Sequence, residues 1–134
     1  MTSIIVAGHG NFAYEIVAIA ERILGKQKNL EFVSVESGEG EYTLDSKLNE
    51  IINNADIDDI LVLSDIFGGS ISNMCLYYAQ KRAHIAVVTG VNLPMLIKSL
   101  AYRDRLDLKG LVSIACSGGK DGIVDACGIL EKKD

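Results

Sequence analysis

A histidine stands between two glycines at the point where an apolar run gives way to a helical pattern. The run Ile-Ile-Val-Ala at positions 4–7 is followed by Gly8, His9 and Gly10, which is typical of a buried strand that turns sharply into a helix. Imidazole is the side chain whose unperturbed pKa lies closest to neutrality, so it can accept and release a group under cellular conditions. His9 is therefore the first candidate for a reactive residue.

An aspartate and a glycine pair follow another strand-like run. Asp65 follows Ser64 at the end of the apolar run 60–63 and leads into Gly68, Gly69 and Ser70. The carboxyl ends of parallel strands meet at one edge of a sheet, and ligands bind at that edge in open α/β proteins. If the strands that end at His9 and Asp65 are adjacent, the two side chains lie within reach of each other.

Such a pair has a defined chemistry. A carboxylate that accepts a hydrogen bond from Nδ1–H fixes the imidazole tautomer and leaves Nε2 free to act as a nucleophile. Gly68 and Gly69 supply N–H groups at the beginning of a helix, where anions bind, and the Ser70 hydroxyl is a further donor to phosphoryl oxygens. A nucleophilic imidazole, an orienting carboxylate and an anion cradle together predict phosphoryl transfer to histidine.

The elements that position these residues follow from the periodicity. Strands are predicted at residues 3–7, 31–35, 59–64, 85–89 and 110–115. Helices are predicted between them, with apolar stripes over residues 12–23, 44–52, 70–80, 94–102 and 121–130. Thr43 and Ser70 are expected to cap the second and third helices. Alternating strands and helices indicate an α/β fold, a single domain over residues 1–134 with a doubly wound, mainly parallel five-stranded sheet and helices on both faces.

Composition excludes several classes of function. The chain has 134 residues, 49% of them hydrophobic, and a net charge of −5, so it can bury a core and offers no basic patch for nucleic acid. We expect a cytoplasmic protein, because no apolar segment is long enough for a membrane span or signal peptide. The three cysteines are expected to be reduced, and no cofactor or metal site is expected, because no Cys/His spacing fits zinc.

Three other functions remain open from the residues alone. Gly-His-Gly-Asn-Phe-Ala at positions 8–13 fits a dinucleotide-binding fingerprint, with Glu36 as the acid for a ribose hydroxyl. Asp65 could instead be the phosphorylated residue of a receiver-like module, although the acids that hold Mg²⁺ in such modules are missing after the first strand. An interaction domain without chemistry is the third, in which His9 and Asp65 are turn residues.

Four segments together resemble a known family. They are Ile-Ile-Val-Ala-Gly-His-Gly-Asn-Phe-Ala at 4–13, Leu-Gly-Lys-Gln at 24–27, Ser-Asp-Ile-Phe-Gly-Gly-Ser at 64–70 and Gly-Val-Asn-Leu-Pro-Met-Leu at 90–96. The chain resembles the IIA component of the mannose family of the bacterial sugar phosphotransferase system, whose members also serve fructose, sorbose and N-acetylgalactosamine. The resemblance covers nearly the whole chain. It departs at Ile71, where family members often have proline, and this leaves the sugar open.

The resemblance implies roles and partners. His9 matches the histidine that is phosphorylated on its tele nitrogen by the histidine-containing phosphocarrier protein and passes the phosphate to the IIB component, which serves the membrane IIC and IID components. Asp65 matches the orienting aspartate and Ser70 the site serine. The resemblance also implies a homodimer, in which a C-terminal strand, here about residues 110–115, can be exchanged between subunits.

Several further residues are candidates around this centre. Gly10 joins Gly68, Gly69 and Ser70 as a candidate for phosphate binding. Candidates for a site or partner-contact loop are Asn11, Phe12, Phe67, Asn92, Pro94 and Met95. For Asn92 and Pro94, a helix start explains the residue types equally well.

Overall fold

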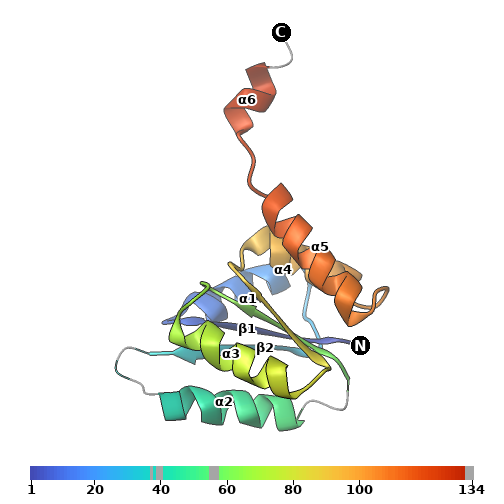
Figure 1. Ribbon diagram of the computed structural model, residues 1–134. Helices are drawn as coiled ribbons and strands as arrows, with labels where there is room; N and C mark the ends of the chain where they lie inside the picture. The colour runs from blue at the N-terminus through green and yellow to red at the C-terminus, as the bar shows by residue number, and fades with distance from the viewer. Residues whose placement is uncertain (37, 39–40, 55–57, 132–134) are drawn as a thin grey trace.

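Four strands and six helices make up the described part of the chain (Figure 1), with strands and helices alternating as far as α4 and two more helices following it. The computed structural model describes residues 1–36, 38, 41–54 and 58–131. In chain order the elements are β1 (Ser3–His9), α1 (Phe12–Leu24), β2 (Leu30–Val35), α2 (Glu41–Asn54), β3 (Ile60–Ser64), α3 (Ser70–Lys81), β4 (Ile85–Thr89), α4 (Leu93–Tyr102), α5 (Leu108–Asp121) and α6 (Ala126–Glu131). The first four predicted strands are confirmed to within a few residues at their ends.

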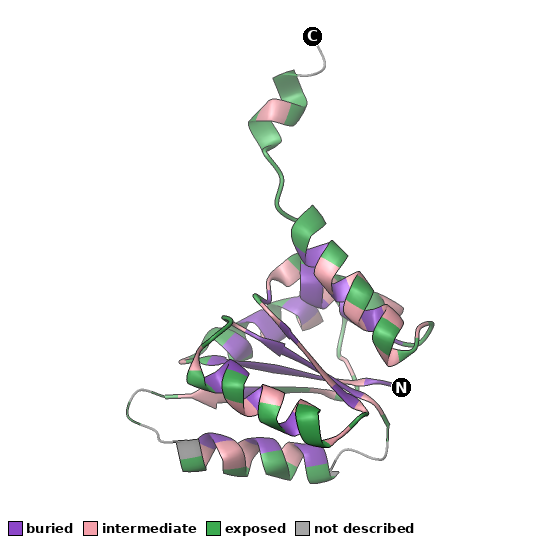
Figure 2. Ribbon diagram, viewed as in Figure 1, coloured by how far each residue is buried: buried purple, intermediate pink, exposed green. Residues whose placement is uncertain are grey.

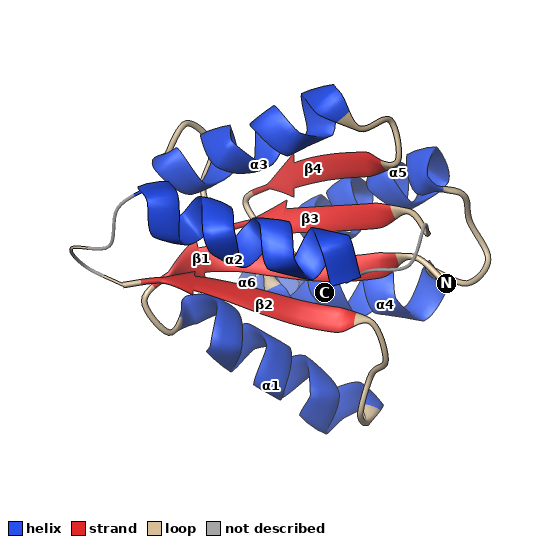
Figure 3. Cartoon of the chain, turned by 90° about the horizontal axis from the view of Figure 1, so that it is seen from below, coloured by secondary structure: helices blue, strands red, loops and turns tan. Residues whose placement is uncertain are grey.

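The strands form one parallel sheet in the order β2-β1-β3-β4. All four arrows in Figure 3 point the same way, so the carboxyl ends of the strands lie along one edge. The chain moves outward from β1 to β2 and then crosses to β3 on the other side of β1. The ends of β1 and β3 are therefore the topological switch point of the sheet, where open α/β folds bind ligands.

Helices cover both faces of the sheet, as predicted. Alternate residues of each strand point to opposite faces. Ile4, Val6 and Leu63 pack with α1, α4 and α5, whereas Ile5 and Val62 pack with α2 and α3. Figure 2 shows the central strands buried between these two helical layers. The sheet is thus a rigid platform, and only its edges are open for function.

The prediction of a fifth strand at residues 110–115 is wrong. This segment lies inside helix α5, so the sheet has four strands. Its buried residues recur with helical spacing at Leu111, Ala115, Gly118 and Gly119, and the side chain of Asp107 caps the helix by accepting the N–H of Gly110 at 2.8 Å. The β-branched residues within Gly-Leu-Val-Ser-Ile-Ala favour a strand locally, but packing against a neighbouring helix decides the outcome. The expectation of an exchanged strand at these positions is overturned with it.

Helix α5 packs closely on α4 because its last turns are made of small residues. A Cβ added to Gly118 would lie 3.0 Å from Lys98 Cβ, and one added to Gly119 would lie 2.8 Å from Met95 Cε. The atom added at Gly118 would press on the stem of Lys98, and the one added at Gly119 would displace the end of the Met95 side chain. The α4–α5 pair completes the layer that α1 begins.

Helix ends differ in detail from the prediction. The second helix begins at Glu41, so Thr43 lies within it, and the third is capped by Gly69, with Ser70 as its first helical residue. The last helix covers Ala126–Glu131 instead of residues 121–130. This helix and the segment before it extend away from the body in Figure 1. Within the described ranges, no helix has the length and apolar character needed to cross a membrane.

Candidate active site

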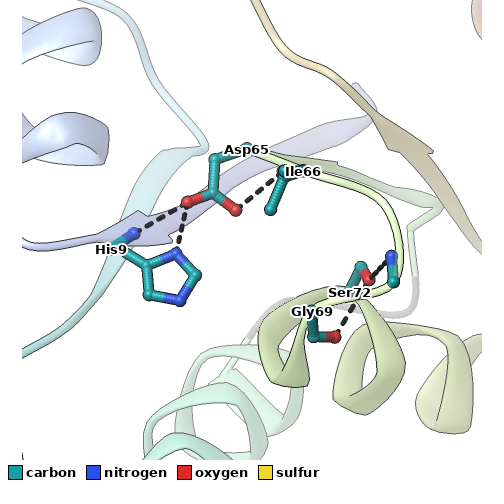
Figure 4. A network of polar contacts seen from close by, with 6 residues as sticks. His9, Asp65, Ile66, Gly69 and Ser72 are labelled. Carbon is teal, nitrogen blue, oxygen red and sulfur yellow. Dashed lines mark hydrogen bonds and ion pairs between the residues drawn. The ribbon is translucent and has the colours of Figure 1, made fainter.

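His9 and Asp65 meet at the carboxyl ends of β1 and β3 (Figure 4). Asp65 Oδ2 accepts a hydrogen bond from the main-chain N–H of His9 at 3.0 Å and lies 2.7 Å from His9 Nδ1. The pairing of β1 with β3 places these strand ends side by side, since Ala7 is opposite Ser64 in the register. The two sequence-predicted residues are thus brought together by the topology.

The contact fixes how the imidazole can react. An ionised carboxylate only accepts hydrogen bonds, so Nδ1 carries the proton and Nε2 keeps its lone pair in the neutral ring. The His9 side chain is 57% exposed, whereas that of Asp65 is 15% exposed. The carboxylate is therefore held inside the loop while the nucleophilic edge of the ring faces solvent.

Asp65 remains ionised despite its position. Burial alone would raise its pKa, but the hydrogen bonds from the His9 ring and main chain, the charge of His9 and the N–H of Ile66 outweigh burial and lower the pKa below the usual value. Ile66 N–H donates to Oδ1 at 2.8 Å, so both carboxylate oxygens are engaged. The ionised form needed to orient the imidazole is the form that the loop stabilises.

Gly8 permits this close approach. A Cβ at this position would lie 2.9 Å from Phe12 Cδ2 and 3.5 Å from Asp65 Oδ2. A larger residue would push the ring of Phe12 aside and crowd the carboxylate. Sequence reasoning did not single out Gly8 on its own; its position one residue before the histidine was the available signal.

The loop between Asp65 and α3 brings a helix N-terminus to the ring. Gly68 adopts a left-handed conformation, with φ +86°, which glycine reaches without strain. Gly69 follows so close to the imidazole that a Cβ added to it would lie 4.0 Å from His9 Cε1. The first helical hydrogen bond of α3 runs from Asn73 N–H to Gly69 carbonyl oxygen at 3.0 Å. The N–H groups of residues 69–72 precede it and are the donors such a terminus offers to an anion.

One predicted phosphate donor is already engaged. Gly68 N–H donates to Ser72 Oγ at 2.9 Å, so it is not free to bind phosphate. The candidate donors on this loop are therefore those of Gly69 and the first turn of α3. Ser70 is exposed at the first position of this helix and lines a cavity of about 560 Å³ between α2 and α3, together with Asp45 and Tyr77. Ser72 was not identified from the sequence, because a serine in the first turn of a helix does not by itself indicate which backbone group its hydroxyl will contact.

The predicted residues at the start of α1 lie beside His9. Gly10 has φ +57°, and its N–H donates to Val35 carbonyl oxygen at 2.9 Å, so it extends the pairing of β1 with β2. Asn11 is exposed, and Phe12 is 40% exposed. Phe67, on the loop after Asp65, is 74% exposed. These side chains are exposed on the segments that directly follow His9 and Asp65, so a partner can reach them.

Asn92, Pro94 and Met95 serve the α4–α5 contact. Asn92 caps α4 by accepting Met95 N–H at 2.9 Å and donates from Nδ2 to Gly119 carbonyl oxygen at 3.0 Å. Met95 is 5% exposed, and a Cβ added to Gly122 would overlap the ring of Pro94. The structure thus gives all three a packing role behind the sheet edge.

Metal-ligating side chains do not cluster in the described ranges: no group of three or more His, Cys, Asp or Glu residues there could hold an ion. Of the cysteines, Cys75 is buried, Cys116 half-buried and Cys127 exposed, and none forms a disulfide. Burial, followed by the negative charge of Asp65, raises the pKa of Cys75 to about 12. A buried thiol in this state is unreactive, so the imidazole of His9 remains the candidate nucleophile of this edge.

Comparison with known proteins identifies the class. The family described as PTS system fructose IIA component matches residues 3–115. The fructose-specific EIIA component of Bacillus subtilis is 33% identical over 114 residues, which cover 84% of this chain and 78% of that protein. The mannose-specific EIIAB component of Escherichia coli K12 is 32% identical over 123 residues, which cover 90% of this chain but 38% of that protein. The chain therefore spans less than half of the latter relative.

Solved structures share the fold. The phosphotransferase system component EIIA from Streptococcus agalactiae superposes with a TM-score of 0.87 at 29% identity, over 93% of this chain and 97% of that one. Fold and family together define a phosphotransfer component of the sugar phosphotransferase system. Within that system, the chain belongs to the mannose-family IIA components.

Proposed function

We propose that His9 accepts a phosphoryl group on Nε2 from the histidine-containing phosphocarrier protein and passes it to a IIB component. The observation that carries this proposal is the 2.7 Å contact between Asp65 Oδ2 and His9 Nδ1. With Nδ1 protonated, the Nε2 lone pair attacks phosphorus, the N–P bond of the donor breaks, and the donor imidazole leaves with the electron pair. Transfer to the IIB component runs the same step outward.

Asp65 has two tasks in this scheme. It holds the tautomer in which Nε2 is nucleophilic, and it faces the positive charge that the imidazole acquires as the new N–P bond forms. Because the loop keeps Asp65 ionised through hydrogen bonds from His9 and Ile66, this charge stabilisation is in place before the reaction begins. Preorganised charges of this kind cost no reorganisation in the transition state.

The first turn of α3 completes the site. Gly69 lies close to the ring, since a Cβ added to it would lie 4.0 Å from His9 Cε1, and the dipole of the helix that begins there favours a negative group. Ser70 adds a hydroxyl at the same terminus. These groups neutralise the phosphoryl oxygens, so the scheme needs no metal ion or organic cofactor.

The site of phosphorylation can be tested by spectroscopy. The chain is incubated with phosphoenolpyruvate, enzyme I and the phosphocarrier, and the ³¹P and ¹⁵N spectra of the product are recorded. The proposal predicts an acid-labile phosphoramidate whose imidazole couplings assign phosphorus to Nε2, together with discharge when a IIB component is added. Phosphate on Nδ1, or an acid-stable product on Asp65, would contradict it.

The assembly and location are part of the same proposal. The relatives carry fructose-specific and mannose-specific names, so the sugar is one for this family of transporters, reached through IIB and the membrane IIC and IID components, with transfer in the cytoplasm. We also propose a homodimer, supported by the apolar side chains of the C-terminal segment. Ile123 is 79% exposed and Leu130 is 66% exposed, and a second subunit would cover them.

A further inference from the structure

Ser72 is a buried polar residue with an unusual pair of partners. Its side chain is fully buried. Its Oγ accepts the N–H of Gly68 at 2.9 Å and donates to the carbonyl oxygen of Gly69 at 3.1 Å (Figure 4). One hydroxyl therefore uses its donor and an acceptor site on two consecutive glycines of the loop that follows Asp65.

Those two glycines are the part of the site with the least intrinsic order. Glycine loses more backbone freedom on folding than any other residue, and Gly68 occupies the left-handed region at φ +86°. The loop is tied on its other side by Asp65, whose Oδ1 accepts Ile66 N–H. Between that bond and the first helical bond of α3, the contacts of Ser72 hold the turn.

We propose that Ser72 is a positioning residue for phosphoryl transfer, which fixes the Gly68–Gly69 turn so that the donors at the beginning of α3 stand ready beside His9. The inference rests on the proposed function. Gly69 is the residue whose added Cβ would lie 4.0 Å from His9 Cε1, so a change in its peptide orientation alters what the phosphoryl group meets. Ser72 itself is fully buried, so its hydroxyl acts through the loop and not on the phosphoryl group.

A second buried serine shows what an ordinary structural role looks like. Ser99 is also fully buried, and its Oγ donates to Met95 carbonyl oxygen at 2.8 Å within α4. That bond ties one helical turn to itself, and the helix is held by its own backbone bonds without it. Ser72 instead reaches out of its helix to a loop. The two serines are therefore a matched pair for mutation.

The test compares Ser72→Ala with Ser99→Ala and wild type in phosphoryl transfer from the phosphocarrier. Alanine keeps the size of the buried side chain, so both variants are expected to fold, which circular dichroism checks. For Ser72→Ala we expect kcat to fall about tenfold, the effect of losing about one preorganised hydrogen bond. KM for the phosphocarrier should stay within about twofold, since only transition-state contacts change. Ser99→Ala should keep the wild-type kcat.

Amide spectra supply a readout that a purely structural role would not move. In wild type, the ¹H–¹⁵N signals of Gly69, Ser70 and Ile71 should shift on phosphorylation as their N–H groups meet the phosphoryl oxygens. In Ser72→Ala these shifts should shrink. Wild-type kcat and undiminished shifts in Ser72→Ala would overturn the inference alone. If wild-type protein takes up no phosphate at all, the proposed function fails and this inference fails with it.

Discussion

The two edges of the sheet both carry a charged side chain that joins separate elements, but one stabilises the fold and the other positions a reactive group. At the amino edge, Arg103 is 3% exposed, and its guanidinium donates to the carbonyl oxygens of Thr2, Lys28 and Asn29. At the carboxyl edge, Asp65 binds His9, whose side chain is 57% exposed. One network closes the fold around a buried charge, whereas the other holds a reactive group at the surface.

The two side chains differ in whether they keep a group that is free to react. The donors of Arg103 point at backbone oxygens at the start of β1 and in the α1–β2 connection, and a guanidinium neither loses a proton nor attacks an electrophile. His9 uses one ring nitrogen for Asp65 and keeps the other free. A buried side chain whose donors bind the backbone stabilises the fold. An exposed side chain that keeps one nitrogen free can react.

Replacing Arg103 should have the largest effect on stability. Arg103→Leu removes a hydrogen-bond donor from several carbonyl oxygens at the amino edge of the sheet. We therefore expect the free energy of unfolding to fall by about 3 kcal/mol. Urea denaturation measures this directly. Phosphoryl transfer by the folded fraction should be unchanged, because the edge concerned is remote from His9.

The control for this variant is Arg105→Leu. Arg105 is exposed, and its guanidinium lies 5.7 Å from the centre of the Tyr102 ring, so its loss should cost less than about 1 kcal/mol. Equal costs for the two arginines would show that burial does not distinguish them.

Replacing Asp65 should affect phosphoryl transfer far more than stability, the reverse of the result expected for Arg103. Asp65→Asn keeps the shape but removes the charge and can bind the wrong imidazole tautomer, so we expect transfer to and from His9 to slow about 100-fold. Asp107→Asn is the matched control, because Asp107 caps α5 at Gly110 and asparagine caps equally well. Rapid-quench kinetics report the rates. An unchanged rate in Asp65→Asn would reduce Asp65 to a turn residue.

Lowering the pH should weaken the stabilising contribution of Asp65 and leave that of Arg103 unchanged, and this effect is smaller than the two above. The pKa of Asp65 lies below its ordinary value in the folded protein, because hydrogen bonds from His9 and Ile66 outweigh burial, so its ionised form contributes stability above about pH 4 that fades as the pH falls through the folded pKa. The difference in Tm between wild type and Asp65→Asn should therefore shrink between pH 5 and pH 3 in thermal scans.

Arg103 provides the reference for that experiment. Its guanidinium stays charged throughout the acid range, so the Tm difference between wild type and Arg103→Leu should be the same at pH 5 and pH 3. A loss of both differences together would indicate general acid denaturation instead of titration of Asp65.

Local patterns predicted the centre of the site but not its support. The strand before His9 and the run before Asp65 are apolar on both faces, as parallel strands require, so both residues could be placed at one edge of a parallel sheet. Their pairing could be predicted only on the condition that the two strands are adjacent, which the structure supplies. The role of Ser72 could not, because a serine in a helix contacts either solvent or a loop, and only the three-dimensional path of Gly68–Gly69 decides which.

The fifth strand fails for a different reason. Val112 and Ile114 have high strand propensity, and the helical spacing of Leu111, Ala115 and Gly118 competes with it in the same segment. Gly118 and Gly119 have low helix propensity, yet they are the residues that allow α5 to approach α4. Tertiary packing therefore determines this element, and a local pattern does not contain that information.

His9 is the proposed phosphoryl acceptor, and the predictions on phosphoryl transfer depend on this assignment. Intact-mass spectrometry of wild type and His9→Ala after incubation with phosphoenolpyruvate, enzyme I and the phosphocarrier tests it most directly. His9 is half-exposed at the end of β1, so the variant should fold, which its circular dichroism spectrum checks. We predict one acid-labile phosphate on wild type and none on His9→Ala. A phosphate gain on both proteins would contradict the account.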